Sequence, residues 1–199
     1  MQSENKTLLI LDLDETLIHA SERELDRPGD FRLDHYHVYK RPHLDSFLAD
    51  VENDFLLAVW SSASDEYVQE VASAIFKKPE HLIFIWGNSR CTYRRNFEPE
   101  LTRMHRLHYD RQYYYVKPLK KVKRLGFDLN RILIVDDSPY KVADNYGNAI
   151  YPKPYEGEIH DDELPLLAKY LKTLRDEPNV RRLEKRGWRE RMIDRYPGL

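Results

Sequence analysis

The chain has 199 residues, which is the size of one domain or of one domain with an elaborated insert. Hydrophobic residues make up 41% and charged residues 33%, so the chain can bury a core and is not disordered throughout. With only 7 Gly, 11 Pro and no repeat, it is neither collagen-like nor of low complexity. No apolar run approaches the about 20 residues that cross a bilayer. A single Cys allows neither an internal disulfide nor a multi-cysteine zinc site.

The net charge of −2 conceals an uneven distribution. Residues 1–89 carry 17 acidic and 8 basic side chains, whereas residues 90–131 carry 12 basic and 4 acidic ones. The basic block predicts an element that faces an anion, and the alternative is a charged face that contacts only solvent. Because the chain starts without a secretory signal pattern, we expect a cytoplasmic protein, or a nuclear one in a eukaryote. We also expect a monomer without membrane contact.

Short apolar runs alternate with helix-length segments along most of the chain. The runs are typical of strands buried on both faces of a sheet, and they lie at 7–11, 55–60, 81–86 and 131–135. Helices are expected at 42–51, 64–76, 118–125 and 161–174, followed by a charged helical tail at 178–199; a short strand is expected at 148–151. This alternation predicts an α/β fold with a doubly wound, mostly parallel sheet in a single domain over 1–199. Two segments interrupt the alternation, 21–40 and 87–115.

Acidic side chains directly follow two of the predicted strands. Asp12 and Asp14 follow the first strand, and Asp136 and Asp137 follow the strand at 131–135. Ligand sites of such sheets form at the carboxyl ends of the strands, where neighbouring carboxylates repel each other unless a cation lies between them. Mg²⁺ is the hard, oxygen-binding cation that this set suits. The alternative is that the acids only cap the helices that follow each strand.

Hydroxyl and ammonium groups are expected near the same edge of the sheet. Ser61 and Ser62 follow the strand at 55–60 and can hold an anionic oxygen, and Lys117 or Lys120 offers a cation at the start of a helix. Carboxylates, a metal ion, a hydroxyl and a lysine together are the equipment for phosphoryl transfer, which depends on positioning and charge neutralisation.

The sequence contains three segments that occur together in one protein family: DLDETLIH from Asp12, KRPHLDSFL from Lys40 and VDDSP from Val135. They resemble the haloacid dehalogenase (HAD) superfamily and, within it, the FCP/SCP-like branch of NLI-interacting-factor-like phosphatases. Relatives in this branch dephosphorylate the C-terminal domain of RNA polymerase II. The resemblance covers residues from about 8 to 171. It implies a HAD-like, Rossmann-like fold in which the stretch at 87–115 is an insert after the second motif that covers the site and selects substrates.

The resemblance implies a mechanism through two carboxylates. Asp12 would be the nucleophile that forms an aspartyl-phosphate, and Asp14 would act as the general acid and then the general base. Mg²⁺ would bind to the Asp12 carboxylate, the Asp14 backbone carbonyl and Asp137. Asp137 departs from the better-known C-terminal-domain phosphatases, which carry Asn there, but it is also a good Mg²⁺ ligand.

Other residues take supporting roles by the same resemblance. Thr16 would fix the loop that carries the two aspartates, and Asp136 would orient the lysine or a metal-bound water. Ser61 would hold a phosphoryl oxygen, and Tyr67, six residues later, matches a family tyrosine.

The lysine has two candidates. The segment VKPL from Val116 resembles the family's VKDL and favours Lys117. The spacing from Lys117 to Asp136 is about three residues longer than in close relatives, however, and Lys120 would need no gap. We therefore expect Lys117, with Lys120 as the alternative.

The insert is rich in arginine and tyrosine, which suit phosphate recognition and stacking on a base or a peptide. Arg90, Arg94 and Arg95, together with Ser62, are the expected substrate-binding residues. The other arginines of the insert are Arg103, Arg106 and Arg111. The alternative is a packed hairpin whose tyrosines are core residues and whose arginines are solvated.

Three functions remain open from the sequence. The first is a Mg²⁺-dependent phosphomonoesterase that acts on phosphoserine or phosphothreonine in proteins. The second is a phosphatase that acts on nucleic-acid ends or nucleotides, bound through the basic insert. The third is a binding module of the same fold without catalysis, and Asp14 argues against it because a pure binder needs no second carboxylate there.

Overall fold

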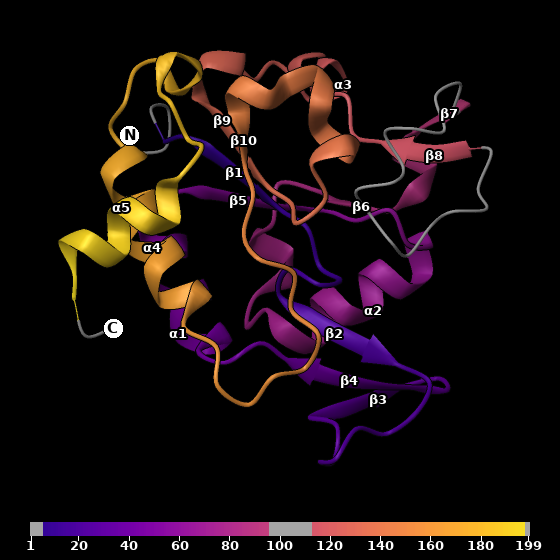
Figure 1. Cartoon of the computed structure of the whole chain (residues 1–199). Coiled ribbons are helices and arrows are strands. Elements are labelled where there is room, and N and C mark those ends of the chain that lie inside the picture. Colours follow the sequence, from indigo (N-terminus) through magenta and orange to yellow (C-terminus); the bar gives the residue numbers. More distant parts are fainter. Residues whose placement is uncertain (1–5, 96–112, 198–199) are drawn as a thin grey trace.

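Five parallel strands form the central sheet of the computed structural model, which describes residues 6–95 and 113–197. Their order across the sheet is β10-β9-β1-β5-β6, with β1 in the middle. In chain order they are β1 (Leu8–Leu11), β5 (Leu56–Trp60), β6 (Ile85–Trp86), β9 (Ile132–Val135) and β10 (Ala149–Ile150). The expected α/β fold with a doubly wound parallel sheet is confirmed (Figure 1).

Alternate residues of β1 pack into two separate cores, one on each face of the sheet. Leu9 and Leu11 belong to the larger core, to which four helices contribute: α1 (Leu44–Asp54), α2 (Asp65–Ile75), α4 (Glu163–Leu174) and α5 (Trp188–Arg195). Leu8 and Ile10 belong to the smaller core, with α3 (Lys120–Lys123) and the 3-10 segment η6 (Pro139–Asn148). Because both faces of β1 are buried, its sequence is an unbroken apolar run.

The helix bounds differ from the expected ones where the backbone at a helix end takes a left-handed conformation. At α2 the expected cap is present, since the Ser64 side chain accepts a hydrogen bond from the Tyr67 N–H at 3.3 Å. The first predicted helix starts later than expected, at Leu44, because His43 before it has a left-handed backbone with φ 66°. The helix expected at 118–125 is only the short α3, and the chain turns out of it at Gly126, which has φ 97°.

The strand expected at 81–86 is also shorter than expected. Only β6 pairs in the ladder, because the 3-10 turn η2 (Pro79–His81) occupies the start of that segment. Residues 82–84 still follow β5, since the Ile83 N–H donates to the Leu57 carbonyl at 2.8 Å.

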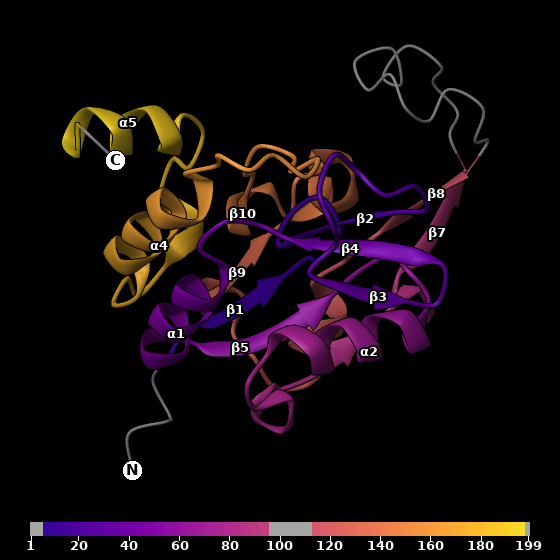
Figure 2. The same ribbon diagram turned by 90° about the horizontal axis from the view of Figure 1, so that it is seen from below.

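A small antiparallel sheet occupies most of the first interrupting segment. It consists of β2 (Ile18–Ser21), β3 (Phe31–Leu33) and β4 (Tyr36–Lys40) in the order β2-β4-β3. Because β2 starts just after the loop that follows β1, this sheet lies beside the carboxyl end of the central strand (Figure 2).

The second interrupting segment contains an antiparallel hairpin of β7 (Thr92–Arg95) and β8 (Tyr113–Val116), preceded by the 3-10 turn η3 (Asn88–Arg90). Figures 1 and 2 place this hairpin on the carboxyl-end side of the central sheet. The 3-10 turn η5 (Leu129–Arg131) leads into β9.

The C-terminal tail is helical in two separate pieces, the 3-10 turn η7 (Val180–Arg182) and α5. It docks on the domain, because Trp188 stacks on Tyr170 of α4 with ring centroids 5.5 Å apart. Within residues 6–95 and 113–197, the structure contains no helix with the length and apolarity to cross a membrane.

Candidate active site

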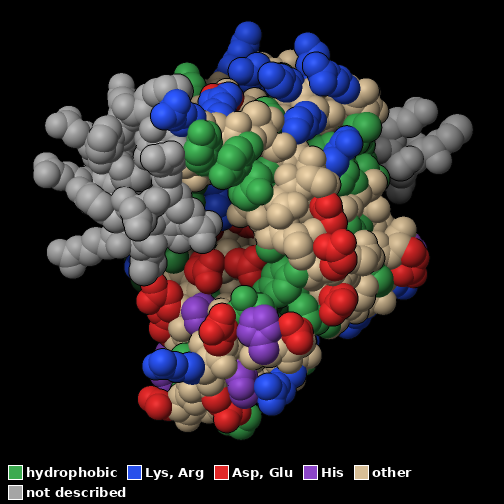
Figure 3. Space-filling model, turned by 90° about the vertical axis from the view of Figure 1, so that its right-hand side faces the viewer, with side chains coloured by type: hydrophobic (Ala, Val, Ile, Leu, Met, Phe, Trp, Pro, Cys, Tyr) green, Lys and Arg blue, Asp and Glu red, His purple; other side chains and the backbone are tan. Residues whose placement is uncertain are grey.

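The pairing of β1 with β9 brings two acidic pairs to one edge of the sheet. Leu11 lies opposite Val135 in the register, so Asp12 and Asp136 are neighbours just beyond the strands. Asp12, Asp136 and Asp137 each offer a carboxylate oxygen, and these oxygens all lie within 4.8 Å of one another. Figure 3 shows acidic side chains in a hollow on this face of the molecule. The strand-end acids therefore form one cluster.

Lys117 lies between two of these carboxylates. Its ammonium is 2.9 Å from Asp12 Oδ2 and 2.6 Å from Asp136 Oδ2. All three residues are buried, with at most 1% of their surface exposed. Lys120, the alternative from the sequence, is exposed at the start of α3. The fold thus brings Lys117 to the carboxylates and leaves Lys120 outside.

A second lysine, Lys141 of η6, was not expected from the sequence. Its ammonium is 3.5 Å from Asp12 Oδ2, and its backbone carbonyl accepts a hydrogen bond from the Lys117 N–H at 2.7 Å. The available signal was its position shortly after Asp136 and Asp137. Spacing alone could not show which way its side chain points, because η6 contains residues with non-helical backbone angles.

Asp14, two residues after Asp12, is held by two hydroxyl groups. Tyr67 donates to Asp14 Oδ1 at 2.6 Å, and Ser61 donates to Asp14 Oδ2 at 3.3 Å. The Ser61 hydroxyl in turn accepts from the Ala63 N–H at 3.1 Å. The fold therefore brings the expected Ser61 to Asp14 and gives Tyr67 a direct contact that the sequence did not indicate.

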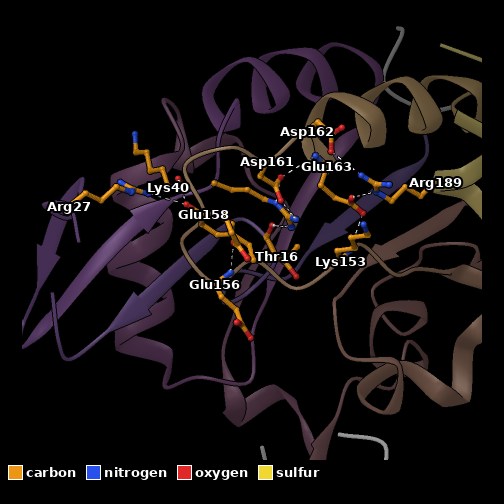
Figure 4. A network of polar contacts seen from close by, with 12 residues as sticks. Thr16, Arg27, Lys40, Lys153, Glu156, Glu158, Asp161, Asp162, Glu163 and Arg189 are labelled. Atoms are coloured by element: carbon orange, nitrogen blue, oxygen red, sulfur yellow. Dashed lines mark hydrogen bonds and ion pairs between the residues drawn. The ribbon is translucent and has the colours of Figure 1, made fainter. Parts of the chain in front are cut away.

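Thr16 closes the loop that carries Asp12 and Asp14. Its hydroxyl accepts a hydrogen bond from the Asp137 N–H at 3.3 Å, and its carbonyl accepts one from Arg41 at 3.0 Å. Arg41 also makes two bonds of 2.8 Å to the carboxylate of Asp161. Figure 4 shows this network around Thr16 and Asp161, extending to Arg189 of α5. The aspartate loop is thus tied to the segment that follows β9 and to the segment that precedes α4.

Arg41→Leu should destabilise the protein strongly. The Arg41 side chain is fully buried and that of Asp161 is 15% exposed, so the substitution leaves a largely buried carboxylate without its partner. We expect a loss of about 3–5 kcal/mol in the free energy of unfolding, measured by urea denaturation. Arg175→Leu is the matched control, because its ion pairs with Asp54 and Asp176 lie at the surface and should contribute far less. Equal losses from the two variants would contradict this account of the network.

The electrostatic environment shifts the pKa values of Asp12 and Asp14 in opposite directions. Burial raises the pKa of Asp14 to about 6; the hydrogen bond from Tyr67 opposes this, and the charge of Asp12 adds to it. Burial also acts on Asp12, but Lys117 and Lys141 outweigh it and hold the pKa of Asp12 below its ordinary value. One carboxylate thus stays ionised while its neighbour can carry a proton near neutral pH, which is an arrangement suited to acid–base chemistry.

The acidic cluster fits a bound divalent cation. When all are ionised, the carboxyl groups of Asp12, Asp14, Asp136 and Asp137 carry more negative charge than the two lysine ammonium groups at Asp12 can offset. Burial raises the pKa of Asp137 to about 7. Its Oδ1 atom is buried without a hydrogen-bond partner among the described residues. A buried carboxylate oxygen without a donor is a group that a hard cation would satisfy.

Two of the expected substrate-binding residues, Arg90 and Arg94, contact side chains outside this cluster. Arg94 makes a two-pronged ion pair with Asp144 of η6, and Arg90 packs over the Trp86 ring at 4.5 Å from its centroid. Arg95 is exposed on β7, and Ser62, next to Ser61, is half-buried. The remaining insert arginines, Arg103, Arg106 and Arg111, lie outside the described residues.

Comparisons with known proteins agree with the fold and the motifs. The model of a family described as NLI interacting factor-like phosphatase matches residues 7–181. The chain therefore belongs to this family of HAD-like proteins, and the resemblance noted in the sequence is confirmed.

Curated relatives share about three residues in ten with this chain. CTD small phosphatase-like protein 1 of Caenorhabditis elegans is 30% identical over 171 residues, which are 82% of this chain and 30% of the relative. The human carboxy-terminal domain RNA polymerase II polypeptide A small phosphatase 1 is 28% identical over 87% of this chain and 61% of that protein. The chain thus spans between 30% and 61% of the length of these two relatives.

A solved structure supports the fold. The fission yeast RNA polymerase II CTD phosphatase bound to beryllium fluoride superimposes with a TM-score of 0.54 at 16% identity, covering 96% of this chain and 62% of that one.

Proposed function

We propose that this protein is a Mg²⁺-dependent phosphomonoesterase that works through an aspartyl-phosphate on Asp12. The arrangement of Asp12 carries the proposal. Its carboxylate is buried at the end of β1 with a lowered pKa, two lysines lie within 3.5 Å, and Asp14 lies beside it with a pKa raised to about 6. An ionised nucleophile next to a protonatable carboxyl is what two-step phosphoryl transfer requires.

In the first step the Asp12 carboxylate attacks phosphorus, and the bond from phosphorus to the leaving oxygen breaks. Asp14 gives its proton to that oxygen, so that the product leaves as an alcohol. In the second step Asp14 accepts a proton from water, which attacks the phosphorus and breaks its bond to Asp12. Inorganic phosphate is released and the Asp12 carboxylate is restored.

The other residues of the site position these groups. Bound Mg²⁺, held by Asp12, Asp137 and the Asp14 carbonyl, would neutralise charge on the phosphoryl group. Lys117, fixed by Asp136, would supply a positive charge beside the nucleophile. Ser61 would hold a phosphoryl oxygen, and Thr16 would keep the loop in place through its bond from the Asp137 N–H.

The proposed substrate is a protein that carries phosphoserine or phosphothreonine. The support is family membership and the name of the human relative, a small phosphatase named for the carboxy-terminal domain of RNA polymerase II. A nucleic-acid end is the second candidate, favoured by the 12 basic residues between 90 and 131. Hydrolysis of a phosphopeptide compared with 3′- and 5′-phosphorylated oligonucleotides at matched concentration separates the two. A folded protein that hydrolyses none of these and no aryl phosphate would be a binding module.

Removal of divalent cations should stop the reaction. Because the acidic cluster repels a dianionic substrate, excess chelator should reduce aryl phosphate hydrolysis to less than about a hundredth of its value with Mg²⁺. Added Mg²⁺ should restore the activity, which excludes damage by the chelator. Full hydrolysis in excess chelator would contradict the proposed role of the metal.

The insert arginines should affect the binding of large substrates and leave the chemistry unchanged. Replacing Arg90, Arg94 and Arg95 by Ala should raise KM for a multiply phosphorylated peptide by a factor on the order of ten, because three surface cations are lost. The kcat for a small aryl phosphate should not change, since the carboxylates are untouched.

Two further measurements distinguish a role of these arginines in binding from a role in packing. KM of the unmodified protein for the peptide should rise steeply with salt. The melting temperature of the triple variant is the second measurement. If the arginines only stabilise the fold, for example through the Arg94–Asp144 ion pair, the triple variant should melt at a lower temperature and lose activity on the peptide and on the aryl phosphate in parallel.

A further inference from the structure

The two lysines at Asp12 differ in what surrounds them. The Lys117 side chain has no exposed surface, whereas that of Lys141 is 13% exposed. Both ammonium groups approach the same atom, Asp12 Oδ2, at 2.9 and 3.5 Å. Lys117 therefore lies behind the nucleophile in the interior, and Lys141 lies on its more open side.

The two lysines also differ in their hydrogen bonds. Lys117 makes short bonds to two carboxylates, with its Nζ 2.6 Å from Asp136 Oδ2. Lys141 has only the long 3.5 Å bond to Asp12 Oδ2 within residues 6–95 and 113–197. An ammonium group carries three N–H donors, so Lys141 keeps donors for a further anionic partner.

The backbone around Lys141 is well fixed. Its N–H donates to the Ser138 carbonyl at 3.0 Å, and its carbonyl accepts from the Lys117 N–H. The neighbouring Tyr140 packs edge-on against Tyr114 of β8, with ring centroids 5.8 Å apart. The ammonium group therefore extends from a fixed point, which makes its reach to Asp12 a property of the fold.

We propose that Lys141 is a second phosphate-binding lysine, whose ammonium contacts the phosphoryl group of the substrate and of the aspartyl-phosphate. This inference rests on the proposed function. In an aspartyl-phosphate formed through Asp12 Oδ2, the phosphorus atom carries three further oxygens, which lie close to Oδ2. A cation 3.5 Å from Oδ2 reaches one of them with a small side-chain movement and meets it with its unused donors.

The charge of the site supports this assignment. A phosphate dianion that enters a cluster of four carboxylates needs compensation beyond Lys117, which Asp136 already partly neutralises. Lys141 faces Asp12, Asp136 and Asp137 and supplies a second positive charge at the entrance to the nucleophile.

The test compares Lys141→Met with Lys141→Arg and with Lys123→Met, in which an exposed lysine of α3 is the matched control. Inorganic phosphate is the probe, and its inhibition constant is measured with an aryl phosphate as substrate. Lys141→Met should weaken phosphate binding at least about tenfold and lower kcat/KM by a similar factor or more, because a charge-assisted hydrogen bond is lost. Lys141→Arg should recover much of both losses, and Lys123→Met should match the unmodified protein.

A second readout separates this role from simple charge balance. Mg²⁺ binding is measured by calorimetry on the same variants. If Lys141 only offsets the acidic cluster, Lys141→Met should bind Mg²⁺ more tightly and keep its affinity for phosphate, and that result overturns the inference. Unchanged affinity for both ligands overturns it as well.

The remaining outcomes are also decisive. If Lys141→Met does not fold, Lys141→Gln, which also lacks the charge, gives the same comparison. An unmodified protein that hydrolyses no phosphomonoester overturns the proposed function together with this inference. An active protein whose phosphate affinity is insensitive to Lys141 overturns the inference alone.

Discussion

Asp12→Asn is expected to abolish turnover of every phosphomonoester while leaving the protein folded. The amide cannot attack phosphorus, so kcat should fall by about four to six orders of magnitude. The fold should persist, because Lys117 keeps its 2.6 Å ion pair with Asp136 and the cluster loses one of its excess negative charges. Steady-state kinetics and a melting curve measure the two effects.

The matched control for Asp12→Asn is Asp50→Asn, which removes an exposed carboxylate from α1. It should be as active as the unmodified protein. Residual activity of Asp12→Asn above about one per cent would mean that another group attacks phosphorus.

Asp14→Asn should have an effect that depends on the leaving group. An alkoxide needs a proton in order to leave, so the loss of the general acid should slow hydrolysis of an alkyl phosphate or phosphoserine peptide by about 10³-fold. An aryl phosphate has a leaving oxygen that hardly needs a proton, so the rate of its first step should fall much less. Single-turnover kinetics on both substrates measure that step separately from breakdown of the intermediate.

Glu15→Gln is the control for Asp14→Asn, since it removes the neighbouring carboxylate of the same loop. The Glu15 side chain is 40% exposed and lies 3.5 Å from His19, and no hydrogen bond joins it to Asp14 among the described residues. It should change neither rate appreciably. Equal losses of Asp14→Asn on alkyl and aryl substrates would argue against Asp14 as the general acid.

The central sheet could be predicted because burial on both faces leaves a strong pattern. Residues 8–11 are apolar without a break, since both cores need them, and the same holds for β9. The small sheet β2-β4-β3 could not be predicted in the same way. Its strands are three to five residues long and only partly buried, so their alternation is too short to distinguish from a loop.

The acidic cluster could be predicted because strand order, once inferred, places the residues after adjacent parallel strands together. Asp12 and Asp136 needed only that rule. The position of Lys141 could not be predicted from strand order. Its approach to Asp12 depends on the irregular backbone of η6, in which Val142 and Asn145 depart from helical angles. The bond from Tyr67 to Asp14 likewise depends on how α2 docks, which spacing along the chain does not encode.

Trapping the covalent intermediate tests the central claim most directly. The protein is mixed with a phosphorus-labelled aryl phosphate and Mg²⁺, quenched with acid, digested and mapped by mass spectrometry. The account predicts an acid-stable, base-labile acyl phosphate on Asp12, which accumulates further in Asp14→Asn and is absent from Asp12→Asn. A phosphoryl group on Ser61 or another residue, or hydrolysis at full rate with no covalent intermediate, would contradict it.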